Sequence, residues 1–205
     1  MEGNPLQLLD WRRQIFELYR EIRGTHDPLE GWELWCDVRE ELFATHPQSP
    51  VPEDDREAYD GPHHFDYDPA LRTVAGIHPM PAETFEVAGS DGSMFAMTRF
   101  GEALFELGGE QRSLQVFWMD VYGGGVFLSF RDETTGAETY GAGRYLLDTV
   151  KGADLGSAGD LLILDFNFAY QPSCAYDPKW SCPLAPPQNR LEMPVRGGER
   201  LAPDS

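Results

Sequence analysis

The sequence predicts an α+β protein in which two N-terminal helices pack against an antiparallel β-barrel or β-sandwich. Two observations predict this class. Apolar residues recur with helical spacing through the first forty-odd residues, whereas from about residue 64 onward short aromatic and β-branched runs alternate with glycine turns. A chain of 205 residues with 41% hydrophobic content is long enough to bury one core without disulfides. We therefore expect one compact domain overall.

The first helix is expected to begin at Asn4-Pro5, where a capping side chain precedes a proline at the first helical position, and to end at Gly24. A second helix is expected after Asp27, because Asp27 and Glu30 have the spacing of a capping box. The two predicted helices carry apolar stripes, at Leu8, Trp11, Ile15, Leu18 and Ile22, and at Trp32, Trp35, Val38, Leu42 and Phe43. Residues 1–46 are thus predicted to form a helical hairpin.

Residues 47–63 are predicted to be a linker or covering loop, because Pro47, Pro50 and Pro52 interrupt any regular element. Residues 64–205 are predicted to form the antiparallel β domain with a proline-rich C-terminal motif. TFEVAG and SMFAMTRF flank Ser90-Asp91-Gly92, EALFEL and SLQVFWMD flank Gly108-Gly109, and VFLSF and ETYGAGRYLL flank RDETTG. Strands joined by tight turns pair antiparallel, so a meander of roughly seven to nine strands is expected.

A further run, DLLILDFNF, is almost continuously apolar. This pattern predicts a central strand buried on both faces. Alternation along such a strand would place Asp165 and Asn167 on one face, where buried polar groups need a partner from the protein or from a ligand.

The charge balance argues against two classes of partner. The chain has 35 acidic and 16 basic residues and a net charge of −19, whereas nucleic acids and anionic membranes need clustered Lys and Arg. Only Lys151 and Lys179 are lysines, a composition that fits a salt-rich cytoplasm and GC-rich coding equally well. No signal peptide and no apolar run of membrane-spanning length occurs, so a cytoplasmic protein is predicted.

Cys174 and Cys182 lie eight positions apart in a stretch that contains Pro172, Pro178 and Pro183. Four interpretations stay open: two structural thiols, a redox or nucleophilic pair, a disulfide, or two metal ligands. A zinc site would need further His or Cys ligands, and no CxxC or HxxxH spacing supplies them. His63 and His64, adjacent on an extended chain, point to opposite faces. No metal site is therefore predicted.

Arg144 follows Gly141 and Gly143, which remove side chains from one face of the expected strand and permit a close approach. With Tyr145 or Tyr140 beside it, Arg144 has the chemistry to hold a carboxylate or phosphate. An internal ion pair of Arg144 with Asp or Glu is the alternative.

Several motifs resemble a bacterial and archaeal family catalogued as domain of unknown function 1684, in order and over most of residues 6 to 200. They are LFATHPQSP, FDYDPALR, FRDETTGAETYGAGRYL, DFNFAYQPSCAYDPKWSCPLAPPQNRL and VRGGER. The family pattern corresponds here to Asn167, Tyr170, Pro172, Cys174, Cys182, Pro183, Pro186, Pro187, Asn189, Arg190 and Leu191. Gln171 stands where the family often has Asn. The resemblance implies a shared fold and a shared surface, and it implies no established activity.

The function expected from the sequence is a small-molecule site at the mouth of the barrel, with an anionic ligand. Arg144, Tyr145, Asn167, Asn189 and Arg190 would bind the ligand, and Cys174 or Tyr170 would react or transfer a proton, as in a cofactor-free hydrolase or isomerase. One alternative is an interaction module whose Trp11, Trp32 and Trp35 form a partner or homodimer surface. A flavin-binding barrel is a third, although few basic residues lie within the strands to hold a phosphate.

Overall fold

The structure is a computed structural model that describes residues 4–202. Helix α1 spans Pro5–Gly24 and helix α2 spans Pro28–Thr45. Each starts at a side-chain cap: the carboxamide of Asn4 accepts from the N–H of Leu6 at 3.0 Å, and the carboxylate of Asp27 accepts from the N–H of Leu29 at 2.9 Å. These bonds satisfy amides that the first turn of a helix leaves unpaired. The predicted helix pair is confirmed.

Nine strands follow the helices in the described part of the chain, and all the pairings between them are antiparallel. Seven of them form one sheet in the order β6-β5-β4-β3-β2-β8-β7, and β1 pairs with β9 separately. The predicted α+β class is confirmed, and the strand number lies within the predicted range. The strands are β1 (His63–His64), β2 (Arg72–Ala88), β3 (Met94–Leu107), β4 (Glu110–Met119), β5 (Val126–Phe130), β6 (Arg144–Asp148), β7 (Ser157–Ala158), β8 (Leu161–Asp165) and β9 (Glu199–Arg200).

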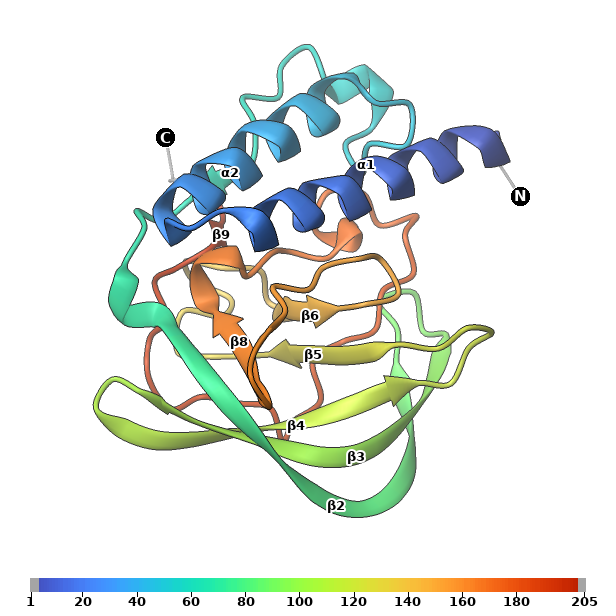
Figure 1. Ribbon diagram of the computed structural model, residues 1–205. Helices are drawn as coiled ribbons and strands as arrows, with labels where there is room; N and C mark the ends of the chain where they lie inside the picture. Colours follow the sequence, from blue (N-terminus) through green and yellow to red (C-terminus); the bar gives the residue numbers. More distant parts are fainter. Residues whose placement is uncertain (1–3, 203–205) are drawn as a thin grey trace.

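The large sheet curls without closing into a barrel, so of the two predicted forms the sandwich-like arrangement is the one observed (Figure 1). The strand β6 at one end of the sheet is joined to the chain beyond β8 by a single residue pair. There the N–H of Tyr145 donates to the carbonyl of Tyr170 at 2.8 Å, and the N–H of Tyr170 donates back at 3.0 Å. The fold therefore has no barrel mouth in which a ligand site could sit.

The strand β2 is longer than the sequence indicates. Its first part pairs with β8, and β3 pairs with it along most of its length. The register with β3 shifts between Pro79 and Glu83, where Pro79 and Pro81 interrupt the ladder. Prolines are tolerated at such irregularities because no ladder N–H is needed there. The first part of β2 was not predicted, because the prolines interrupt its pattern and only its last residues resemble a strand in sequence.

The connection between β5 and β6 differs from the expectation. The run ETYGAGRYLL is predicted as strand, but β6 begins only at Arg144, and residues 131–143 form a series of turns. The buried carboxylate of Asp132 organises them, because it accepts from the hydroxyls of Thr134 at 2.9 Å and Thr135 at 3.0 Å. Side-chain bonds of this kind compete with strand pairing.

The prediction for DLLILDFNF is wrong in two respects. The strand β8 lies between β2 and the two-residue β7 near the end of the sheet, and Leu161 at its start is 40% exposed. The strand then ends at Asp165, whose carboxylate accepts from the N–H of Asn167 at 3.0 Å and starts the short 3-10 helix η3 (Phe166–Phe168). Asp165 and Asn167 consequently do not share a strand face.

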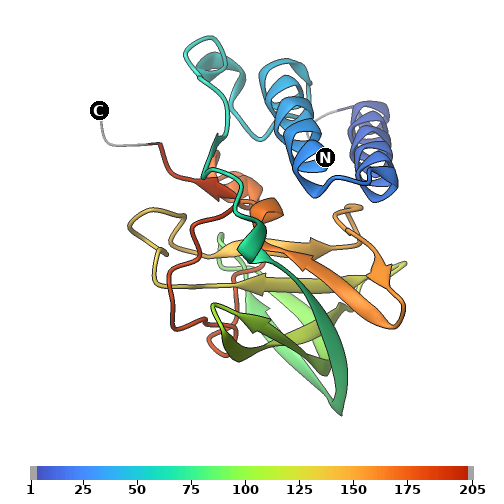
Figure 2. The same ribbon diagram turned by 60° about the vertical axis from the view of Figure 1, so that its left-hand side comes forward.

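The two helices lie side by side over one end of the sheet (Figure 2). Trp35 of α2 packs on Phe168 of η3, with ring centroids 5.5 Å apart, in the upper part of the core. The concave side of the sheet encloses a second part, where Phe130 and Phe166 pack 5.1 Å apart. The C-terminal segment completes this second part with Val195.

Trp35 is fully buried, so the predicted surface of Trp11, Trp32 and Trp35 does not exist as a unit. Trp11 and Trp32 are partly buried against the same core. Among residues 4–202, no helix has both the length and the apolar character needed to cross a membrane.

Candidate functional site

A buried ion pair joins the helical layer to the C-terminal strand. Arg39 of α2 donates from Nε to Oε1 of Glu199 in β9 at 2.8 Å, and its Nη2 donates to the same oxygen. The other carboxylate oxygen of Glu199 accepts from the N–H of Gln171 at 2.6 Å and from the hydroxyl of Tyr176 at 3.0 Å. Glu199 is fully buried. Burial is the largest single influence and lowers the pKa of Arg39, but the charge and hydrogen bond of Glu199 together with Tyr176 and Tyr19 raise it above the usual value, so the guanidinium stays charged.

Aromatic rings surround the Arg39 guanidinium. Its central carbon lies 5.0 Å from the ring centroid of Trp35, 4.8 Å from that of Phe43 and 5.1 Å from that of Tyr170. Such contacts favour a charged guanidinium in a site shielded from water. The remaining nitrogen, Nη1, makes no hydrogen bond to any other described residue.

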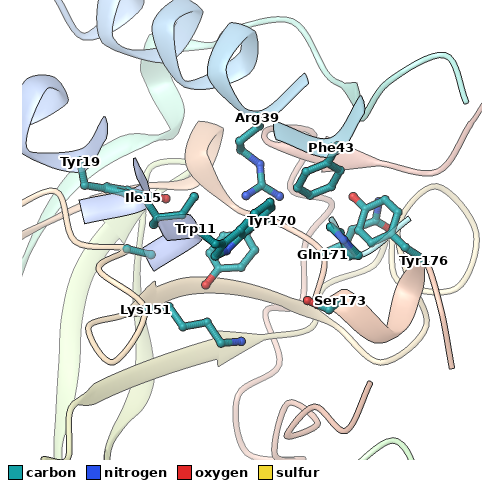
Figure 3. A pocket seen from close by; sticks show the side chains of 12 residues that line it. Trp11, Ile15, Tyr19, Arg39, Phe43, Lys151, Tyr170, Gln171, Ser173 and Tyr176 are labelled. Atoms are coloured by element: carbon teal, nitrogen blue, oxygen red, sulfur yellow. The ribbon is translucent and has the colours of Figure 1, made fainter. Parts of the chain in front are cut away.

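Arg39 and Lys151 face one cavity from opposite sides of the Tyr170 ring (Figure 3). We call this cavity, of about 60 Å³, the central cleft. It lies between the helices, the turn after β6 and the C-terminal motif. Its wall is mostly aromatic and apolar, and the lining residues are Trp11, Ile15, Tyr19, Arg39, Phe43, Pro50, Lys151, Ala153, Tyr170, Gln171, Ser173 and Tyr176.

A second hollow of about 270 Å³, the side groove, shares Trp11, Lys151 and Ser173 with the central cleft. The shared residues make the two spaces neighbours along one wall. The side groove is lined by Leu8, Trp11, Arg12, Gln48, Lys151, Ser173, Trp180, Ser181 and Cys182.

The charge of this wall is opposite to that of the whole chain. Arg12, Arg39 and Lys151 line the two spaces, and none of the described lining residues is Asp or Glu. The chain as a whole has 35 acidic residues against 16 basic ones. Carboxylates lie behind the wall: Glu199 pairs with Arg39, and the Nζ of Lys151 lies 3.7 Å from Asp148. In each pair, the cation is therefore the member that lines the cavity, and the carboxylate lies behind it.

Two tyrosines expected at the site lie together, and one reaches the central cleft. The rings of Tyr145 and Tyr170 meet edge to face with centroids 5.6 Å apart. The hydroxyl of Tyr170 lies 3.4 Å from Asp148, and that of Tyr145 donates to the carbonyl of Pro183 at 2.6 Å. Burial and the Asp148 carboxylate raise the pKa of Tyr170 well above its usual value. At neutral pH Tyr170 is therefore a proton donor and not a phenolate nucleophile.

The two asparagines expected to orient a ligand are fully buried, and backbone groups occupy their amides. Asn167 accepts from the N–H of Asp68 at 3.0 Å and donates to the carbonyl of Asp68 at 2.8 Å. Asn189 accepts from the N–H of Gln115 at 2.8 Å and donates at 2.9 Å to the carbonyls of Gln115 and Ser129. The structure does not bring them to the central cleft. We infer that these two asparagines hold the C-terminal half of the chain against the rest of the fold.

The two arginines expected to bind an anion are also apart from the central cleft. Arg144 is 1% exposed, donates to the carbonyl of Val195 at 2.8 Å and to that of Gly197, and lies 3.6 Å from Asp132. Burial lowers the pKa of Arg144 to about 10, against the opposing effect of Asp132. Arg190, near the end of the proline-rich C-terminal motif, is exposed.

We expect Arg144→Met to lower the free energy of unfolding by about 2 to 3 kcal/mol, because buried carbonyls lose a charged donor. Urea unfolding measures the change. The matched control is Arg190→Ala, which removes an exposed arginine of the same motif and should leave the stability nearly unchanged. Equal effects of the two substitutions would contradict the structural role assigned to Arg144.

Cys174 and Cys182 are free thiols, so the disulfide interpretation does not describe this structure. Cys174 is in the short 3-10 helix η4 (Ser173–Ala175), and Cys182 lines the side groove. Among residues 4–202, no group of three or more His, Cys, Asp or Glu side chains is placed to hold a metal. His63 and His64 form β1 and pair with β9.

Sequence reasoning missed Arg39, Glu199 and Lys151. A signal for Arg39 was present, because it lies four residues after Trp35 and four before Phe43, on the apolar face of α2. A charge on that face indicates a buried partner. Glu199 had no comparable signal, since its short strand shows no periodicity.

The fold and the central cleft define a class: an α+β protein with a helix pair over a curled antiparallel sheet and a cationic cleft between the two layers. The chain belongs to the family described as "Protein of unknown function (DUF1684)", which matches residues 57–200. A similar solved structure is the solution NMR structure of an uncharacterized protein of Haloarcula marismortui. It has 37% sequence identity and a TM-score of 0.60, and the match covers 84% of this chain and 95% of that one. A search of curated proteins found no match.

Proposed function

We propose that the protein binds a small anionic molecule in the central cleft and the side groove. The observation that carries this proposal is the charge of the wall: three cations and, among the described lining residues, no acid, in a chain of net charge −19. A wall of that sign attracts anions. The cations of the wall would hold the anionic group of the ligand, and the aromatic rings would hold its apolar or aromatic body.

The polar groups at the wall narrow the ligand further. Gln171 lines the central cleft, and its Oε1 is buried without a hydrogen-bond partner among the described residues. A buried acceptor without a partner favours a ligand that also carries a hydroxyl or amine. The cofactor-free hydrolase or isomerase activity expected from the sequence stays a prediction, for which Tyr170 in the wall of the central cleft is the candidate proton donor.

The first test uses benzoate as the anionic aromatic probe and benzamide as its neutral analogue of the same shape, with binding measured by calorimetry. We expect benzoate to bind at least about tenfold more tightly than benzamide, because the charge is what the wall selects. Lys151→Ala and Arg12→Ala should each weaken benzoate binding by about 3- to 10-fold. The matched control is Lys179→Ala, which removes the other lysine of the chain, exposed and paired with Asp177.

Equal affinities for benzoate and benzamide would overturn the proposal. So would a loss in Lys179→Ala as large as that in Lys151→Ala, because the effect would then come from overall charge. If neither probe binds and Lys151→Ala changes nothing, the interaction module without catalysis is the better account.

A further inference from the structure

Cys174 and Cys182 are held by two different parts of the fold. Cys182 is fixed to the β2–β3 turn: the N–H of Ser90 donates to its carbonyl at 3.0 Å, and its own N–H donates to the Ser90 hydroxyl at 3.2 Å. Cys174 is fixed from the β5–β6 connection, because the hydroxyl of Tyr140 donates to its carbonyl at 3.4 Å and lies 3.7 Å from its sulfur. The irregular chain between the cysteines closes the loop.

The two side chains meet between these anchors. Cys182 and Ser173, the residue before Cys174, line the same groove, and the hydroxyl of Tyr140 lies 3.7 Å from the Cys174 sulfur. A hydroxyl that can donate to a sulfur favours its thiolate form. The interaction with Cys182 lowers the pKa of Cys174 to about 6 against the effect of burial, and the same interaction raises the pKa of Cys182, which keeps its proton.

The side groove borders this pair. Cys182 is part of its wall, next to Ser173, Trp180 and Ser181. Each cysteine retains little exposure, 7% for Cys174 and 3% for Cys182, so bulky reagents are kept out. The third cysteine, Cys36, lies on α2, and burial raises its pKa to about 12. The molecule thus contains the thiol pair of Cys174 and Cys182, and a third thiol, Cys36, that is expected to be unreactive.

We propose that Cys174 and Cys182 are a redox-active pair that forms a reversible disulfide on reaction with a small hydroperoxide entering through the side groove. This inference is independent of the anion-binding function. Because Ser173 and Cys182 both line the groove, the bond also reshapes its wall.

The reaction balances in two steps. The Cys174 thiolate attacks the terminal oxygen of the hydroperoxide, the O–O bond breaks, and an alcohol leaves after taking up one proton, so that Cys174 becomes a sulfenic acid. The Cys182 sulfur then attacks the Cys174 sulfur, the S–S bond forms, and the hydroxide leaves as water with the Cys182 proton. Two thiols lose two electrons and two hydrogens, and the peroxide gains them. An external dithiol reverses the change by exchange.

The test treats the reduced, folded protein with hydrogen peroxide, alkylates it after unfolding, and measures the intact mass. We expect a loss of two hydrogens and one alkylated cysteine instead of three, with Cys174 linked to Cys182 in the peptide map. Cys36→Ser is the control and should form the same disulfide. Cys182→Ser should form no intramolecular disulfide and should instead accumulate a sulfenic acid that reacts with dimedone. In Cys174→Ser, dimedone labelling should be at least about tenfold slower.

A second readout does not depend on disulfide formation. In Cys36→Ser, the alkylation rate of Cys174 should be half-maximal near pH 6. Three alkylated thiols after peroxide, a disulfide that includes Cys36, or equal dimedone labelling of the two single variants would overturn the proposal. An alkylation midpoint near the ordinary thiol value of about 8.5 would overturn it as well. Benzoate binding is measured separately, so failure of one proposal does not decide the other.

Discussion

We expect the protein to lose stability steeply as the pH rises above about 10, where ordinary tyrosines ionise. Tyr145, Tyr170 and Tyr176 have pKa values well above the usual one, chiefly because burial disfavours the phenolate. Burial likewise raises the pKa of Tyr19 to about 12, although the charge of Arg39 opposes it. All four residues lie around the buried pair of Arg39 and Glu199 or the β6 edge next to it.

The direction follows from proton binding. Between the ordinary tyrosine pKa and the raised value, the unfolded chain has released a proton that the folded chain still holds. The stability due to each buried tyrosine is therefore complete below about pH 10, and it falls by about 1.4 kcal/mol per pH unit above that value. Arg144 acts in the opposite direction, because its pKa is lowered in the folded state. It is a single group opposing four tyrosines, so the net stability is expected to fall.

The measurement is the free energy of urea unfolding between about pH 9 and pH 11. Tyr170→Phe should make the decline shallower by up to about 1.4 kcal/mol per pH unit, since it removes one ionising group and only a long hydrogen bond. Tyr122→Phe, at a fully exposed tyrosine, is the matched control and should leave the decline as it is. A stability that stays level through this range, or a Tyr122→Phe effect equal to that of Tyr170→Phe, would contradict the prediction.

The parts of the fold that sequence reasoning predicted are those set by neighbours in the chain. The cap at Asn4 and the proline at position 5 determine where α1 begins, whatever the rest of the protein does. The same holds for the turn at Gly108-Gly109, where both glycines have positive φ and join β3 to β4. Local chemistry of this kind can be recognised in a single sequence.

The candidate site depends on residues far apart in the chain, which explains why much of it was not predicted. Arg39 and Glu199 are separated by 160 positions, and no pattern in either segment indicates the other. Arg144 and Asn189 are polar residues beside a motif, which in sequence suggests a ligand site. In the structure their hydrogen bonds go to backbone groups of the same chain. Only three-dimensional packing decides between a polar group that serves a ligand and one that serves the backbone.

The arrangement of charges connects the buried ion pair of Arg39 and Glu199 with the cationic wall of the central cleft and the side groove. Most of the chain's carboxylates lie apart from the two spaces, while Glu199 and Asp148 stand directly behind the cations that face them. A buried carboxylate behind an arginine keeps the guanidinium charged and fixes its direction. The position of Glu199 thus determines both the stability of the helix–sheet junction and the donor available at the central cleft.

We expect Arg39→Met to be the most destabilising single substitution at this junction, by about 3 to 5 kcal/mol, because the fully buried Glu199 would be left without its cation. Glu199→Gln should also destabilise, and Arg39→Met/Glu199→Gln should recover part of the loss, so a double-mutant cycle in urea measures the coupling of the pair. Arg20→Met is the matched control, since it removes an arginine paired with Glu17 on the exposed side of α1, and it should change the stability little. Additive effects of the two single substitutions would show that the pair contributes no coupling, and the Arg39 guanidinium would then need another explanation for its place in the central cleft.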